Sequence, residues 1–575
     1  MGYAEISLKL PTDYDDEQVK SAIRKELQLR SQKFTFRLLG KSLDARKKSD
    51  IHWLIRIGVV SDKITNDAPS GGNSAGNETH MPIQREMLEI PYRKREQKVL
   101  VAGSGPAGFF AAYVLQKSGF DTTLVERGTD VKKRAASIKE FESTGHFNPV
   151  ANYAFGEGGA GTFSDGKLTS RSKHISKEKR FVLSCYVQAG APEEILYMAH
   201  PHLGSDNLRQ IVRQLRKMFL DIGGTILFET MLEDLKIKGS RVQGALTRSG
   251  GGDRLKSSGG RSLSRASVSL SESRTSDRLS ESQTADNVSE SPHVHMEIEA
   301  DEIIIAPGHS AYETFRMLMG KGVQFRSKSF AIGCRVEHPQ ELVNIAQWGR
   351  KSLPGVKAAE YRLTSKGDGQ LPVYTFCMCP GGVIVPATAY ETCNIVNGMS
   401  RYQRNGKFAN AACVAGVNLG RLLSREIEAA ESLEWIEALE HRFYSYSDSY
   451  SVPFCTIQDF IDSKSRQRSY QESSYPLGLI PAPLWELLPA QVSLSLRQGL
   501  KDFGRKLRGF ETGLIMGLES KTSSPVSVIR EKNYRCTGFD NLYMAGEGSG
   551  HSGGIISSAA DGIRVAMSII SKYSG

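Results

Sequence analysis

An apolar run, a glycine turn and a stretch of helical apolar spacing follow one another in this chain of 575 residues. Residues 98–102 predict a short buried strand, and residues 109–117 predict a helix. The turn between them, residues 103–108, has the form GxGxxG. A second predicted strand, 122–125, ends at Glu126. This order predicts the first βαβ unit of a dinucleotide-binding fold.

Each portion of this unit has a physical role toward a nucleotide. Gly103 permits the tight turn, Gly105 lets the backbone approach a pyrophosphate, and Gly108 lets the helix pack close to the strand. The phosphates would lie at the free N–H groups and the positive dipole end of the helix. Glu126 could accept hydrogen bonds from both hydroxyls of a ribose and would repel a 2′-phosphate. We therefore expect FAD or NAD as the bound nucleotide, and not NADP.

The N-terminal residues have a different pattern. Polar and apolar residues alternate over 3–10, which predicts a half-buried strand, and a helix follows over 12–29. Strands are predicted over 34–39 and 51–60, with the basic stretch KSLDARKKSD between them. This pattern predicts a small α+β domain of ferredoxin-like type.

The middle of the chain contains one segment of unusual composition. Residues 207–220 predict an amphipathic helix, whereas 249–292 are rich in serine beside Arg, Asp or Glu. Such a segment buries too little apolar surface to fold, so we expect a disordered insertion. The alternation resumes at Val294, and the run ADEIIIAPGHS over 300–310 predicts a buried parallel strand that ends at a ligand.

Residues 325–510 carry no dinucleotide signature. They predict strands over 328–336 and 373–378 and helices over 410–425 and 433–444, and by elimination they form a cap or substrate domain. The predicted division of the chain is an N-terminal α+β domain over 1–64, a linker over 65–97, a first FAD-binding segment over 98–248, a Ser-rich insertion over 249–292, a second FAD-binding segment over 293–324, the cap over 325–510, and a third FAD-binding segment over 511–575.

Two further stretches are dense in glycine. Residues 152–168, NYAFGEGGAGTFSDGKL, satisfy GxGxxG again, but no apolar strand precedes them and no acid closes a second strand. We interpret them as a loop under the flavin, with a plain surface loop as the alternative. Residues 541–566 predict a strand, a glycine loop and a helix that begins near Gly553.

Composition narrows the choice of partners. The net charge of +11 and the pI of about 9.1 would attract anions such as phosphorylated cofactors, but the basic residues are mixed with acids and no nucleic-acid motif is present. A solvated surface is therefore favoured over a nucleic-acid groove. No apolar run is as long as a membrane helix, and no secretory signal begins the sequence. We expect a cytoplasmic protein, or a chloroplast protein if a transit segment precedes this sequence.

These motifs resemble those of the FAD-dependent oxidoreductase superfamily, which includes glutathione reductase-like and succinate dehydrogenase-like flavoproteins. The sequence is most similar to a poorly characterised group of FAD-dependent proteins of bacteria and plastids. The similar stretches are VAGSGPAG with Glu126, the loop 152–168, the strand end APGHS, TFCMCPGG over 375–382, and GEGSGHSGGIISSAADG. The superfamily usually has Asp where this chain has Glu547, and Thr where it has Pro307.

The resemblance implies a Rossmann-like FAD-binding domain of discontinuous segments, with an inserted α+β cap. It also implies that the last helix begins at the pyrimidine edge of the flavin, where its dipole would stabilise the anionic reduced ring. The expected cofactor-binding residues are Gly103, Gly105, Pro106, Ala107, Gly108, Glu126, Arg127, Arg134, Gly158, Gly159, Gly161, Gly308, Gly546, Glu547, Gly553, Gly554 and Ile555.

Candidate catalytic groups are few. Cys377 and Cys379 form the one close cysteine pair, either a redox pair or two buried thiols beside a glycine turn. His551 and His309 could donate to the flavin or to a substrate, or each could be a structural histidine. Since no second Cys or His pair has metal-ligand spacing, we expect no metal.

We interpret the chain as an FAD-binding oxidoreductase that acts on an undetermined small molecule or receives electrons from a protein donor. Because one complete dinucleotide fold is present, we expect no separate NAD(P)H domain. Two alternatives remain open. One is a flavin-bound scaffold without turnover that recruits a partner such as RNA, and the other is a reductase of unsaturated lipids or isoprenoids.

Overall fold

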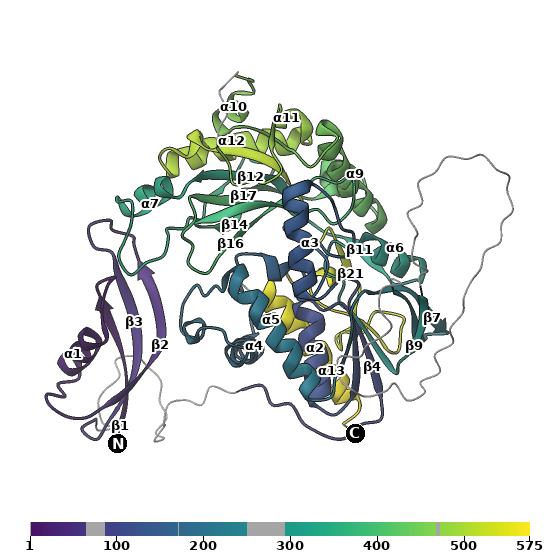
Figure 1. Ribbon diagram of the computed structural model, residues 1–575, viewed down its shortest axis with the longest axis horizontal. Coiled ribbons are helices and arrows are strands. Elements are labelled where there is room, and N and C mark those ends of the chain that lie inside the picture. The colour runs from purple at the N-terminus through teal and green to yellow at the C-terminus, as the bar shows by residue number, and fades with distance from the viewer. Residues whose placement is uncertain (1, 65–86, 171, 250–293, 467–471, 575) are drawn as a thin grey trace.

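The computed structural model describes residues 2–64, 87–170, 172–249, 294–466 and 472–574. Three regions follow from its sheets (Figure 1). A small sheet is built by the N-terminal residues, a parallel sheet contains the glycine turn, and a seven-stranded sheet belongs to the predicted cap. Most of the predicted linker and the predicted Ser-rich insertion lie outside the described residues.

The N-terminal sheet has the order β1-β3-β2 and is antiparallel throughout. Its elements are β1 (Gly2–Leu10), α1 (Asp16–Glu26), β2 (Thr35–Asp44) and β3 (His52–Ser61). The described residues of this region thus have the order βαββ with β3 between β1 and β2, which corresponds to four of the six elements of a ferredoxin-like fold. The predicted start of the helix at Thr12 is wrong, since the Asp15 side chain accepts from the N–H of Gln18 and caps a helix that begins at Asp16.

The parallel sheet has five strands in the order β22-β10-β4-β5-β6. Their bounds are Leu542–Met544, Glu302–Ile305, Lys98–Ala102, Asp121–Val125 and Thr225–Leu227, in that order. The side chains of β4 alternate between the faces of the sheet, as the period of a strand requires. Val99 and Val101 belong to the apolar cluster of α2 (Pro106–Lys117) and α13 (Ile555–Lys572).

The opposite face of β4 packs against a second, antiparallel sheet. Leu100 and Ala102 share an apolar cluster with Leu235 and Val242, which lie in the three-stranded sheet β7-β8-β9. The remaining elements of this half of the chain are β7 (Thr230–Lys238), β8 (Arg241–Ser249), β9 (Val294–Glu299), α3 (Val131–Thr144), α4 (Ser176–Gln188), α5 (Gly204–Asp221) and α6 (Tyr312–Gly320).

The cap sheet has the order β13-β14-β17-β12-β20-β18-β19. The bounds of these strands are Thr364–Ser365, Val373–Cys379, Phe408–Val417, Phe330–Pro339, Leu514–Glu519, Val452–Thr456 and Leu479–Pro481. The other cap elements are α7 (Gln340–Trp348), β15 (Gly382–Pro386), β16 (Val396–Ser400), α8 (Leu419–Leu422), α9 (Ala429–Ser447), α10 (Ile457–Asp462), α11 (Leu484–Leu487) and α12 (Ala490–Lys506), with β11 (Phe325–Ser327) paired to β21 (Val526–Val528) beside them.

Two predictions for the cap are wrong. The first half of the predicted helix 410–425 is strand β17, which lies between β12 and β14 and is buried on both faces. A continuous apolar run does not distinguish such a strand from a buried helix. The predicted cap boundary at residue 510 also falls too early, because β20 is hydrogen-bonded to β12 inside the cap sheet.

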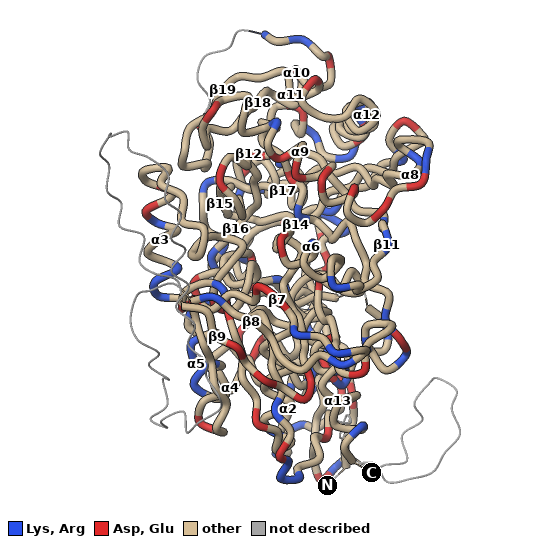
Figure 2. The backbone as a smooth tube through the Cα atoms, turned by 90° about the vertical axis from the view of Figure 1, so that its right-hand side faces the viewer, with Lys and Arg blue, Asp and Glu red and all other residues tan. Residues whose placement is uncertain are grey.

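The N-terminal sheet lies beside the other two regions in Figure 1. Two backbone hydrogen bonds join β2 of this sheet to the segment between α4 and α5. Lys41 N–H donates to the Tyr197 carbonyl at 2.8 Å, and Ala199 N–H donates to the Lys41 carbonyl at 2.9 Å. Basic and acidic residues are interspersed along the described chain (Figure 2).

Candidate functional site

The glycine turn between β4 and α2 leaves no room for two side chains, whereas a Cβ at a third position would make only an ordinary contact. Gly103 has φ +103°, and a Cβ on it would lie 2.3 Å from the carbonyl oxygen of Ala306. A Cβ on Gly108 would lie 1.8 Å from the carbonyl oxygen of Gly103. At Gly105, by contrast, the nearest atom to a Cβ is the Cα of Gly159, 3.8 Å away. The turn is therefore packed on its strand side. At Gly105 its backbone faces residues 152–168, which we call the glycine loop.

Glu126, at the end of β5, is buried and accepts hydrogen bonds with both oxygens. Its Oε2 accepts from the N–H and the hydroxyl of Ser104 at 2.9 and 2.7 Å. Its Oε1 accepts from the N–H groups of Gly128 and Gly156 at 2.9 and 3.2 Å. The carboxylate thus joins the turn to the glycine loop, and a ribose would have to share these oxygens. Ribose binding by Glu126 stays a prediction.

Arg134 lies on α3 and is fully buried. Its Nε donates to the Asn152 carbonyl at 2.8 Å, its Nη2 donates to the Tyr153 carbonyl at 3.0 Å, and its Nη1 is within 3.2 Å of the carbonyls of residues 156, 157 and 159. Burial lowers the pKa of Arg134 to about 10, so the side chain remains a cation at neutral pH. We predicted a cofactor contact here, but the guanidinium instead holds the carbonyls of the glycine loop.

The glycine loop touches both the turn and the last helix. A Cβ on Gly159 would lie 3.0 Å from the Cα of Gly105, and a Cβ on Gly161 would lie 3.1 Å from the Ile555 side chain. Gly158 is packed differently, because a Cβ there would lie 2.2 Å from the Thr162 hydroxyl. These contacts place the loop between the N-terminal ends of α2 and α13.

The C-terminal glycine loop lies on the other side of the turn. A Cβ on Gly546 would lie 2.6 Å from the Cβ of Ala107, and one on Gly548 would lie 2.4 Å from the carbonyl of Gly308. Gly554, which precedes Ile555 at the start of α13, has no atom within 4 Å of such a Cβ. The predicted glycines of three distant segments therefore converge, and the backbone before α13 is open.

An ion pair that the sequence reasoning missed supports this loop. Arg530 donates to both oxygens of Asp561 in α13 at 2.7 and 3.0 Å, and the N–H of Gly546 donates to Asp561 Oδ2 at 2.9 Å. Both charged side chains are 9% exposed. The pair fixes the loop relative to the helix that follows it. An acid within the apolar helix SSAADGI was the available signal.

The two candidate histidines differ in their surroundings. Nδ1 of His309 lies 3.5 Å from Glu547 Oε2, and its Nε2 is buried without a hydrogen-bond partner among the described residues. Nε2 of His551 lies 3.0 Å from the Val528 carbonyl, away from the turn, and burial lowers its pKa. His309 therefore has a buried ring nitrogen left for a ligand.

The candidate cysteines lie in β14, near Arg335 of the cap and Lys167 of the glycine loop. Burial raises the pKa of Cys379 to about 12 and also raises the pKa of Cys377, against the opposing effect of Lys167 and Arg335. Both thiols are protonated near neutral pH, which disfavours a thiolate nucleophile. All eight cysteines are free thiols.

Arg335 is the centre of a buried polar cluster between the cap and the glycine loop. Its Nη1 donates to Glu519 Oε2 at 2.6 Å, and both side chains are at most 2% exposed. Its Nη2 donates to the Cys377 carbonyl at 2.8 Å. Gly398 makes room for it, because a Cβ there would lie 2.1 Å from Nη2. We call the following residues the cap junction: Asp165, Lys167, Arg335, Cys377, Cys379, Arg404 and Glu519.

The arrangement fits a flavin dinucleotide by two observations. The facing backbones at Gly105 and Gly159 carry no side chain that would keep a pyrophosphate away. Nε of Arg127 and Nε2 of His309 are buried without a partner among the described residues, so Arg127 can donate to a ligand and His309 can donate or accept according to its tautomer. The Arg127 guanidinium also packs on the Phe155 ring, 3.8 Å from its centroid, at the glycine loop.

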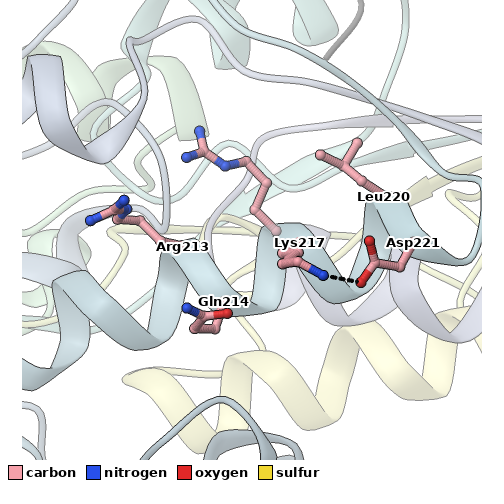
Figure 3. Close-up of a pocket in the computed structure, with 6 residues that line it drawn as sticks. Arg213, Gln214, Lys217, Leu220 and Asp221 are labelled. Atoms are coloured by element: carbon pink, nitrogen blue, oxygen red, sulfur yellow. Dashed lines mark hydrogen bonds and ion pairs between the residues drawn. The ribbon is translucent and has the colours of Figure 1, made fainter. Parts of the chain in front are cut away.

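A hollow of about 300 Å³ lies outside this site, on α5 (Figure 3). Arg213, Gln214, Lys217, Leu220 and Asp221 line it together with Arg216, and Lys217 pairs with Asp221 at 2.7 Å. None of these is a predicted site residue. Within the described ranges, no group of three His, Cys, Asp or Glu side chains is placed to hold a metal ion, and no helix could cross a membrane.

Family comparisons agree with the geometry of the parallel-sheet region. Residues 96–140 match a family described as an FAD binding domain, and residues 329–522 match one described as the C-terminal domain of FAD-dependent proteins. Residues 3–60 match a domain of unknown function. An uncharacterised protein of Clostridium beijerinckii is 32% identical over 579 residues, covering 99% of this chain and 98% of that protein.

The solved structures that match this chain are only distantly similar to it. The structure of CtdE in complex with FAD is 10% identical, has a TM-score of 0.31, and the alignment covers 84% of this chain and 86% of that one. The flavin-dependent brominase Bmp2 is 13% identical with a TM-score of 0.35 over 84% and 80% of the two chains. A geranylgeranyl bacteriochlorophyll reductase-like protein of Thermoplasma acidophilum is 12% identical with a TM-score of 0.33, over 84% and 80%.

Proposed function

The chain belongs to the FAD-dependent oxidoreductase superfamily and its cofactor is FAD, and from this premise we propose that it oxidises or reduces a small molecule between the glycine loop and the cap. The convergence of the glycine turn, the glycine loop and the start of α13 around Gly105 and Gly159 carries this proposal. Bound FAD supplies the redox chemistry, and the chain supplies binding, orientation and access.

The roles of the residues follow from their positions. The turn 103–108 and the N-terminus of α2 would hold the pyrophosphate, and Glu126 would hold the ribose. Arg134 orders the glycine loop from behind. His309 would present its unpartnered Nε2 to the ligand, beside Glu547 and the C-terminal glycine loop. The substrate would approach from the cap junction, since binding sites often lie where two domains meet.

The test is an absorption spectrum of the purified protein, before and after incubation with FAD, followed by anaerobic titration with NADH and NADPH. We expect the visible bands of oxidised flavin, retained on gel filtration. Loss of these bands on adding a nicotinamide would identify the electron donor. Persistence of the bands would direct the search to an organic or protein donor. A protein that stays colourless after incubation with FAD would contradict the proposal.

A further inference from the structure

Lys167 is a cation of the cap junction whose hydrogen-bonding capacity is not filled by the described residues. It lies in the glycine loop, and its Nζ donates to the Met378 carbonyl in cap strand β14. An ammonium group has three N–H donors. Within the described residues, no other hydrogen-bond acceptor for Nζ is found. The side chain is 27% exposed, so this position is open on one side.

The nearby carboxylates are taken by other groups. Asp165 Oδ2 lies 3.7 Å from Lys167 Nζ, but it accepts from Arg404 at 2.7 Å, and Oδ1 accepts from Ser400. Oε2 of Glu360 lies 3.6 Å from Nη1 of Arg404. Among the residues that the structure describes, Lys167 therefore has no carboxylate at hydrogen-bond distance, and Asp165 at 3.7 Å is its ion-pair partner.

Two further titratable groups lie near Lys167, and neither of them neutralises its charge. Glu519 is paired with Arg335 in the cap junction. Burial lowers the pKa of His202 to about 4, so this ring is neutral at pH 7. For Lys167 itself, burial is the largest single effect and opposes the charged form, but Asp165, Cys379 and Cys377 together outweigh it and raise the pKa of Lys167. Lys167 is therefore a cation at neutral pH.

A strained bulge in β14 presents the carbonyl that Lys167 binds. Cys377 has φ +44°, which is uncommon for a residue with a side chain, and the register of β14 against β17 shifts between Phe376 and Cys379. The Cys377 carbonyl thereby meets Arg335, and the Met378 carbonyl meets Lys167. Bulges and strained residues recur at binding sites, where they redirect backbone groups.

We propose that Lys167 binds a carboxylate of the substrate, so that the substrate class is an organic acid. The spare N–H donors would hold one carboxylate oxygen at the meeting of the glycine loop and the cap strand. A charge-assisted hydrogen bond is shorter and stronger than a neutral one, and it would orient the substrate relative to the glycine loop. This inference rests on the proposed function, because it places the substrate beside the FAD site.

The test uses FAD-loaded full-length protein titrated at constant ionic strength with acetate, propionate and benzoate. Their neutral amides, acetamide, propionamide and benzamide, are the matched ligands. Binding is followed by the flavin absorption spectrum and by calorimetry. We expect saturable binding of at least one acid and none of its amide. Lys167→Met should weaken binding at least tenfold with FAD retained, whereas Lys173→Met, an exposed cation nearby in the chain, should leave it unchanged.

Each contrary result has a distinct meaning. Equal acid binding in wild type and Lys167→Met, or binding of no acid by the wild type, would overturn the proposal. Equal displacement by chloride or phosphate would identify an inorganic-anion site and overturn the substrate class. Calorimetry does not depend on the flavin, so a protein that retains no FAD would contradict the proposed function while acid binding at Lys167 could still be measured.

Discussion

A ligand at the glycine turn would meet backbone, whereas at the cap junction it would meet buried charges. The turn is shaped by glycines 103, 105 and 108, two of which could not carry a Cβ without a clash below 2.5 Å. The cap junction is shaped by side chains such as Arg335 and Glu519, which are at most 2% exposed. The packing of the glycine turn therefore depends on positions that carry no side chain. The stability of the cap junction depends on buried charges that are paired with one another.

This difference decides what a substitution should do. A side chain added to the turn pushes helix α2 off strand β4, so cofactor binding and packing should fail together. A charge removed from the cap junction leaves its partner buried and unpaired, so stability should fail first. The turn and the junction can therefore be separated by measuring FAD affinity and unfolding free energy on the same variants.

The largest effect on stability is expected at the buried ion pair. Arg335→Leu leaves Glu519 without a counter-charge, which should lower the unfolding free energy by about 3–5 kcal/mol. The double variant Arg335→Leu and Glu519→Leu should cost less than the sum of the two single variants. Urea unfolding measures these values, and Arg316→Leu, which breaks an exposed pair with Glu437, should cost below about 1 kcal/mol. Additive costs in the double variant would contradict the pairing.

The next effect concerns the turn itself. Gly108→Ala would place a Cβ 1.8 Å from the Gly103 carbonyl oxygen, so α2 must move away from β4. We expect loss of FAD from the purified protein and an unfolding free energy lower by about 3 kcal/mol, as in an overpacked core. Gly320→Ala, at the end of α6, is the control because no atom lies within 4 Å of its Cβ. Normal FAD content in Gly108→Ala would contradict the separation of the two regions.

The same contrast explains which features were predictable from the sequence. The turn, its two strands and the start of α13 are local patterns, since the glycines and the apolar runs lie within a few residues of one another. The cap junction is assembled from residues as far apart as Asp165 and Glu519, and no local spacing connects them. The close spacing of Cys377 and Cys379 and a charged Arg335 inside the apolar strand FAIGCRVEHP were the signals available. Strand β17 was predicted as a helix because its burial on both faces removes the alternation that identifies a strand.

The titration of Glu157 tests the comparison further, because this carboxyl group lies in the glycine loop that faces the turn. Burial raises its pKa from 4.5 to about 7, against the opposing effect of Arg216. The folded chain then binds the proton more tightly than the unfolded chain, so stability falls as the pH rises from 4.5 to about 7. The pKa difference corresponds to a loss of up to about 3 kcal/mol.

Replacing this carboxyl should remove that pH dependence. Glu157→Gln keeps a neutral side chain at every pH, so its stability relative to the parent should rise across this pH range. Urea unfolding at several pH values measures the trend, with Glu140→Gln, an exposed carboxyl on α3, as the control. The prediction fails if the two variants show the same pH dependence.

The smallest effect is expected at Arg134, whose side chain donates hydrogen bonds to the carbonyls of the glycine loop. Arg134→Lys keeps the charge but removes the planar guanidinium whose nitrogens reach five loop carbonyls. Leaving some of these buried carbonyls unpaired should cost about 2 kcal/mol. Because the loop faces Gly105 at Gly159, FAD should bind about tenfold more weakly, at a cost of about 1.4 kcal/mol. Fluorescence titration with FAD measures this change, and Arg213→Lys on α5 is the exposed control; FAD affinity unchanged in Arg134→Lys would mean that the loop keeps its shape without the guanidinium.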